Sequence, residues 1–147
     1  MATRTRNIMA EESLRMPDDG RRYELVRGEL RTMTPAAHPH GRIAMRIAAQ
    51  LFQHVEERGL GTVYAAETGF LLARNLDMVR TPDAAFVRRD RVEEVGETEG
   101  YWPAAPDLAA EVVSLGDAYA EVESKVTEWL QAGTRVVILV ETHPTAR

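Results

Sequence analysis

Apolar residues recur along the chain at two spacings, one typical of helices and the other typical of strands. From position 43 to position 55 they return every three or four residues, Phe52 included, which predicts a helix that ends near Gly59. A further helix is predicted from an N-cap at Asp117 to about Ala132. The two longest helices are therefore expected in the second quarter and the last quarter of the chain.

Shorter apolar runs outside these helices indicate strands. We predict a short helix over residues 10–16 and strands over residues 23–26, 29–33, 62–66, 69–72, 84–87, 108–113 and 136–140. The first two strands flank Arg27-Gly28 and are expected to form a hairpin. The last two are buried runs on either side of a helix, which implies that they are parallel. The predicted fold class is therefore α/β (α+β), with a mixed central β-sheet flanked by helices.

The length and composition limit the class of protein. A chain of 147 residues with 44% apolar content can bury one core, so residues 1–147 are expected to form a single domain. Cysteine is absent, which excludes disulfides, zinc–thiolate sites and cysteine nucleophiles. Residues 1–9 contain no signal-peptide pattern and are expected to be flexible. No stretch approaches the roughly 20 apolar residues of a membrane span, so we expect a cytoplasmic protein.

The distribution of charge sets one lysine apart. The formal net charge of −5 argues against nucleic-acid binding through overall basicity, although the arginines can still cluster locally on one face. The chain has 18 cationic side chains of the Lys and Arg type, and only one of them, Lys125, is a lysine. Because arginine supplies the ordinary surface charge, this single lysine is a candidate for a specific role.

Two carboxylates in apolar surroundings are candidates for a metal site. Glu111 interrupts the strand 108–113, where a carboxylate costs free energy unless it is paired, protonated or bound to a metal. Its alternative is an ion pair with an arginine or a place at an exposed strand end. Asp83 precedes another apolar strand, and its simpler role is to cap a turn. Two such carboxylates on neighbouring strands, with a backbone carbonyl and waters, suit Mg²⁺ or Mn²⁺.

Lys125 is the third candidate, on the helix predicted from Asp117. It lies at the border of an apolar stripe that consists of Tyr119, Val122, Val126, Trp129 and Leu130. Its alternative is a surface lysine paired with Glu121 one turn earlier. A flexible ammonium with three donors suits an attacking water or a developing phosphorane oxygen better than a planar guanidinium does. Asp83, Glu111 and Lys125 are therefore the predicted catalytic residues.

Several segments carry a family resemblance. Pro82-Asp83 followed by Glu111-Val112-Val113 resembles the PD-(D/E)XK motif of the restriction-endonuclease-like superfamily. More specifically, the chain resembles the Uma family of “putative restriction endonucleases” over residues 23–30, at His40, and over residues 80–87 and 107–113. The resemblance extends from about Ala10 to the last predicted strand.

The resemblance implies a restriction-endonuclease-like fold in which Asp83, Glu111 and the backbone carbonyl of Val112 bind the metal. The usual lysine of the superfamily would fall at position 113, where this chain has Val113. Members of the resembled family carry a lysine on the following helix instead, and Lys125 matches it. Family members also continue beyond the last predicted strand, which implies that C-terminal strands are lacking here.

Other polar residues are secondary candidates. His38 and His40 precede the long helix, and His40 matches a family histidine that would contact the site or a phosphate, the alternative being a loop residue. Glu67 is either an outer-sphere carboxylate or a surface residue beside a turn. Glu24 is a further candidate whose simplest role is a cross-strand ion pair in the hairpin. Trp102 either stacks on a base, anchors the core or forms a dimer contact.

These features favour a Mg²⁺-dependent endonuclease or phosphodiesterase that hydrolyses DNA, with a homodimer as an expected assembly. The acidic charge motivates an alternative, an inactive nuclease-fold module for binding or assembly that is accessory to a mobile element or a defence system. A third hypothesis is a metal-dependent hydrolase of small phosphoesters. Cleavage and metal-binding measurements would distinguish the three.

Overall fold

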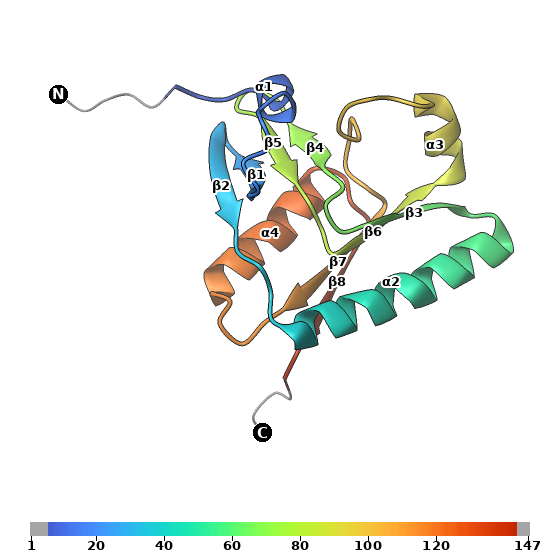
Figure 1. The fold of residues 1–147 in the computed structure, drawn as a ribbon. Coiled ribbons are helices and arrows are strands. Elements are labelled where there is room, and N and C mark those ends of the chain that lie inside the picture. Colours follow the sequence, from blue (N-terminus) through green and yellow to red (C-terminus); the bar gives the residue numbers. More distant parts are fainter. Residues whose placement is uncertain (1–5, 144–147) are drawn as a thin grey trace.

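The computed structural model describes residues 6–143, which form four helices and eight strands (Figure 1). In chain order these are α1 (Ala10–Leu14), β1 (Arg22–Val26), β2 (Glu29–Met33), α2 (His38–Arg58), β3 (Gly61–Ala65), β4 (Phe70–Ala73), β5 (Met78–Arg80), β6 (Ala84–Arg88), α3 (Arg89–Val95), β7 (Leu108–Val113), α4 (Tyr119–Gln131) and β8 (Val136–Glu141). The helices and strands predicted from the hydrophobic pattern are all present, with ends that differ by a few residues.

The strands form two four-stranded sheets and not the single sheet expected from the sequence. Their orders are β2-β1-β5-β4 and β3-β6-β7-β8. β7 and β8 are parallel, as predicted, and the other ladders within the sheets are antiparallel. The hydrophobic pattern missed β5 because a strand of three residues is too short to show alternation. The α/β fold class itself is confirmed.

The long helix begins earlier than predicted. α2 begins at His38, so His38 and His40 lie in its first turn and not in the loop before it. It ends as predicted at Gly59, whose φ of 59° is a left-handed conformation that glycine adopts without steric cost. α2 packs on β3, β6 and β7 (Figure 1). Its buried face does not include Phe52, which is exposed, so that part of the predicted apolar face was wrong.

The last helix and the last strand also differ from their predictions. Asp117 is not the N-cap of α4, because the cap is Ala118 and the Asp117 carboxylate instead accepts a hydrogen bond from the Ser114 backbone N–H at 2.8 Å. The apolar stripe of α4 is narrower than predicted, since Tyr119 and Leu130 are exposed. β8 is an edge strand with alternating exposure, so it is not the fully buried strand that its apolar sequence suggested.

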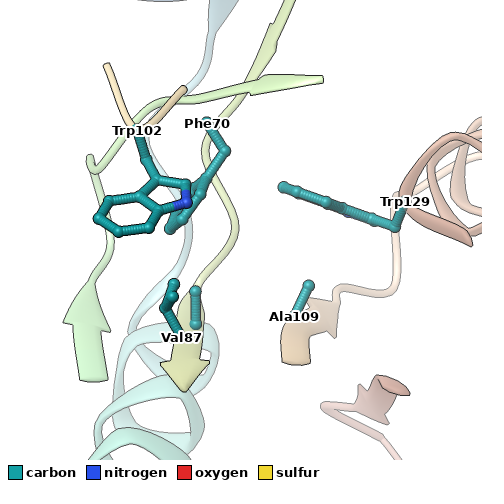
Figure 2. Close-up of a cluster of buried hydrophobic side chains, with 6 residues drawn as sticks. Phe70, Val87, Trp102, Ala109 and Trp129 are labelled. Carbon is teal, nitrogen blue, oxygen red and sulfur yellow. The ribbon is translucent and has the colours of Figure 1, made fainter. Parts of the chain in front are cut away.

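The main core joins the two sheets to α4. Phe70, Ala85, Val87, Trp102, Ala109 and Trp129 form one buried cluster (Figure 2). Trp129 approaches from α4 and meets Phe70 edge to face, with ring centroids 6.3 Å apart. Trp102 lies on the other side of Phe70 and is buried, so among its three predicted roles it is a core anchor. This cluster fixes the position of α4 over β7.

The hairpin turn between β1 and β2 places an arginine in a strained left-handed backbone conformation. Arg27 has φ 50° and Gly28 has φ 78°, the pair of positive angles that defines a type I′ turn. A left-handed conformation costs an arginine about 1–2 kcal/mol, whereas asparagine tolerates it better. We expect Arg27→Asn to stabilise the fold by about 0.5–1 kcal/mol in urea denaturation. Arg27→Ala is the control, and an equal gain from both variants would mean that the arginine charge and not the turn is responsible.

Other expectations concern the chain ends and the membrane. Among residues 6–143, no helix is long and apolar enough to cross a membrane. Within the segment 1–9, the Ile8 N–H donates a hydrogen bond to the Gly28 carbonyl at 2.8 Å, and residues 1–5 lie outside the described residues. The flexibility of that segment, the lack of C-terminal strands and the single-domain organisation all stay predictions.

Candidate active site

Asp83 and Glu111 come together where β6 meets β7. Asp83 directly precedes β6, and in the antiparallel ladder Ala84 faces Ala110 of β7. The ladder ends at this pair, so Asp83 lies next to the segment of β7 that carries Glu111. The Asp83 N–H also donates a hydrogen bond to the Ala110 carbonyl at 3.0 Å. Two carboxylates that are distant in sequence thus lie side by side.

The backbone of Val112 faces this carboxylate pair. Its N–H donates a hydrogen bond to Oδ2 of Asp83 at 2.7 Å. In an antiparallel strand the N–H and C=O of one residue point to the same side. The Val112 carbonyl, which the family resemblance assigns to the metal, therefore points to the side of Asp83.

α4 covers the face of β7 that carries Glu111. The indole N–H of Trp129 donates a hydrogen bond to Oε1 of Glu111 at 3.2 Å. Lys125, one turn earlier on α4, lines the same small pocket as Glu111, a hollow of about 60 Å³ between α4 and β7. Burial raises the pKa of Glu111 to about 7; the Lys125 ammonium lowers this pKa, and the Asp83 carboxylate raises it. The three predicted catalytic residues are therefore brought into one electrostatically coupled group.

Glu24 joins this group from β1. Its carboxylate is almost fully buried, and Nζ of Lys125 lies 3.9 Å from its Oε1. The alternative pairing of Lys125 with Glu121 does not occur, since Glu121 contacts Arg31 at 3.4 Å. Glu24 does form a cross-strand ion pair, but its partner is Arg80 on β5 and not a residue of β2. Lys125 is thus held beside a carboxylate and not left in open solvent.

Arg80 is a residue that the sequence did not single out. Its side chain is 5% exposed and lies between Glu24 of β1, at 3.4 Å, and Glu128 of α4, at 2.8 Å. The Thr81 N–H donates a further hydrogen bond to Oε2 of Glu24 at 3.0 Å. Arg80 is one of many arginines in the sequence, so nothing in the pattern distinguished it. Its position shows that a buried ion network ties the first sheet to α4 next to the candidate site.

The secondary candidates separate into two groups. His40, in the first turn of α2, approaches Asp83 with an Nε2–Oδ2 distance of 3.3 Å, and both side chains are mostly buried. His38 is exposed at the start of the same helix. Glu67 lies in a turn with φ 79°, is 71% exposed and contacts Arg22 at 3.6 Å. His40 therefore adjoins the carboxylate pair, whereas the contact of Glu67 is a surface ion pair outside it.

The donor atoms of the site suit a hard divalent cation. Among residues 6–143, no group of three or more histidine and acidic side chains is placed to hold a metal ion by itself. A cation would therefore bind through Asp83, Glu111, the Val112 carbonyl and waters, an all-oxygen set that Mg²⁺ and Mn²⁺ favour. The raised pKa of Glu111 reflects in part the repulsion by Asp83, and a cation between the two carboxylates would relieve it. These residues fit the metal that the resemblance implies.

The raised pKa of Glu111 predicts a pH dependence of stability. Between pH 4.5, its ordinary pKa, and about 7, the folded protein keeps a proton on Glu111 that the unfolded chain has released. The free energy of unfolding should therefore fall as pH rises through this window, by up to about 3 kcal/mol, and level off above it. Glu111→Gln should remove this decline in urea denaturation series, while the exposed Glu123→Gln should keep it. An unchanged decline in Glu111→Gln would contradict the assignment.

The two sheets, the covering α4 and the paired carboxylates define a nuclease-like α/β domain. The chain belongs to the Uma2 family, described as “Putative restriction endonuclease”, whose sequence pattern matches residues 10–145. A crystal structure of “a putative nuclease belonging to DUF820 from Anabaena variabilis ATCC 29413” has the same fold, with a TM-score of 0.76 and 20% sequence identity. The match covers 91% of this chain and 74% of that chain. No curated protein matches the sequence. The family membership supports a nuclease function in general.

Proposed function

We infer that this protein is a Mg²⁺-dependent endonuclease that hydrolyses phosphodiester bonds of DNA. The observation that carries the proposal is the convergence of Asp83, Glu111 and the Val112 carbonyl beside Lys125. The family supports the reaction class, and the oxygen donors support the choice of metal. A DNA substrate is consistent with exposed arginines on the elements that surround the site, such as Arg31 on β2.

Each residue has a chemical task in this proposal. Asp83 and Glu111 would hold the cation, which would supply positive charge that polarises the scissile phosphate and makes a water easier to deprotonate. Lys125 donates hydrogen bonds that orient the attacking water and stabilise charge developing on the phosphoryl oxygens. The water oxygen forms the new bond to phosphorus while the water loses a proton to solvent, and the bond to the leaving sugar oxygen breaks as that oxygen takes up a proton from solvent. Glu24 positions Lys125, and His40 positions the Asp83 carboxylate.

The proposal is tested by cleavage and calorimetry on the purified protein. Wild-type protein should cut supercoiled DNA with Mg²⁺ or Mn²⁺, and Asp83→Asn should lose at least about 100-fold in rate together with its cation binding. Asp90→Asn, on the exposed surface of α3, is the matched control and should behave as wild type. Wild-type protein that cuts no DNA or RNA, or Asp83→Asn that cuts normally, would refute the assignment.

One observation favours a second candidate, an inactive nuclease-fold module that binds or assembles with a partner. The net charge of −5 is unusual for a protein that binds polyphosphate through its surface. Calorimetry separates the two candidates, because an inactive module would show no cation binding that depends on Asp83 and Glu111. Turnover of nucleotides without cleavage of polymers would instead indicate a hydrolase of small phosphoesters.

A further inference from the structure

The outer side of α2 carries an exposed stripe with a regular spacing. Arg42, Met45, Ala49, Phe52 and Glu56 follow one another at intervals of three, four, three and four residues, so they line one face of the helix. All five are exposed, and Met45 is 68% and Phe52 53% exposed. The opposite face of α2 packs on the second sheet. We call these five residues the outer stripe of α2.

The outer stripe is suited to pair with itself. Ala49 is its central residue and its small side chain allows two helices to approach closely. Arg42 lies seven residues before Ala49 and Glu56 lies seven residues after it. Met45 lies four residues before Ala49, and Phe52 lies three residues after it. A two-fold axis at Ala49 therefore brings Arg42 against Glu56 of a second copy, and Met45 next to its Phe52.

The charges decide the direction of the pairing. A parallel pair of helices would set Arg42 against Arg42 and Glu56 against Glu56, which is unfavourable, whereas an antiparallel pair makes two ion pairs. The antiparallel arrangement also opposes the two helix dipoles. Among residues 6–143, neither Arg42 nor Glu56 takes part in an ion pair of its own. Both charges are thus available to a partner.

We propose that the outer stripe of α2 is a homodimer interface in which two copies of α2 pack antiparallel about a two-fold axis at Ala49. α2 has 21 residues and is about 31 Å long, so the pairing extends along most of one side of the molecule (Figure 1). His40 is in the first turn of α2, and the antiparallel arrangement sets the two candidate active sites near opposite ends of the helix pair.

Cysteine cross-linking tests the axis directly, because the natural chain contains no cysteine. Under mild oxidation, Ala49→Cys should form a disulfide-linked dimer in high yield, since both copies of residue 49 lie at the axis. Ser124→Cys, on the exposed surface of α4, is the matched control and should stay largely uncross-linked. Equal cross-linking of the two variants, or none in either, would overturn the proposal.

The pairing of Arg42 with Glu56 of the second copy is tested by reversing each charge and measuring dimerisation of the whole protein by analytical ultracentrifugation. Arg42→Glu and Glu56→Arg should each weaken the dimer at least tenfold, and the double variant should restore it. Phe52→Glu should yield monomers, whereas Val136→Glu on the exposed edge strand β8 should leave the dimer intact, with circular dichroism confirming that each variant is folded. A monomeric wild-type protein, or a dimer that Val136→Glu and not Phe52→Glu dissociates, would refute the interface. The outcome is independent of DNA cleavage, so it stands or falls separately from the proposed function.

Discussion

Replacing Lys125 by methionine is expected to reduce the rate of DNA cleavage by about 10²–10³-fold, the loss typical when one donor to a developing anionic oxygen is removed. Methionine keeps most of the apolar stem but removes the ammonium beside Glu24 and Glu111. The fall should appear in kcat, with little change in KM, because the lysine acts on the transition state. Steady-state cleavage of a defined DNA substrate measures it.

Two further variants sharpen this expectation. Lys125→Arg should recover little of the activity, since a planar guanidinium cannot occupy the space of a compact ammonium. Arg89→Met removes an exposed cation of α3 and should leave cleavage unchanged. Because the Lys125 side chain is 31% exposed, its loss should change the free energy of unfolding by no more than about 1 kcal/mol. A Lys125→Met protein that cuts at the wild-type rate would remove this lysine from the mechanism.

Replacing Arg80 by methionine should be the most damaging change to stability, with an expected loss of about 3–5 kcal/mol. The guanidinium is almost fully buried between Glu24 and Glu128, and its loss leaves Glu128 without its cation and Glu24 with only the more distant Lys125. A loss of this size is a large part of the total stability of a typical domain. Urea denaturation at pH 7.5 measures it.

A variant that also neutralises the two carboxylate partners of Arg80 is the control for this prediction. Combining Arg80→Met with Glu24→Gln and Glu128→Gln removes the uncompensated charges and should recover most of the lost stability, even if the single variant does not fold. Arg89→Met breaks an exposed ion pair with Glu93 and should cost less than about 1 kcal/mol. If Arg80→Met is as mild as Arg89→Met, the buried network does not stabilise the junction between β1, β5 and α4.

The elements of this fold were largely predictable because their signals are local. The spacing of apolar residues predicted α2 and α4, and a run of apolar residues predicted β7. The errors lie where the signal is weak or not local. β5 is too short to alternate, and Phe52 continues the apolar spacing of α2 although it faces outward. Hydrophobic spacing reports which side chains are apolar, but not which face finds a packing partner.

The residues of the candidate site also fall into those with a local signal in the sequence and those without one. Asp83 and Glu111 were picked out because one carboxylate precedes an apolar strand and the other interrupts one, and the antiparallel pairing of β6 with β7 sets them side by side. Arg80 has no such signal, since its importance depends on Glu24 and Glu128, which lie far from it in sequence. The contact of Lys125 with Glu24 had no signal either, because Glu24 lies far from it in sequence, and the pairing with Glu121 that stood as the alternative is not found.

The sequence alone determined the order of the helices and strands and the membership of a nuclease family. It also identified the carboxylates that lie in apolar surroundings and the single lysine. These properties depend on spacing and residue type, which act over a few positions of the chain. The tertiary structure decided the division into two sheets, the approach of Glu24 and Arg80 to α4, and the coupling of Asp83, Glu111 and Lys125. The physical reason is that burial and Coulomb energy depend on distance in space, and only packing of the core around Trp129 brings these charges together (Figure 2).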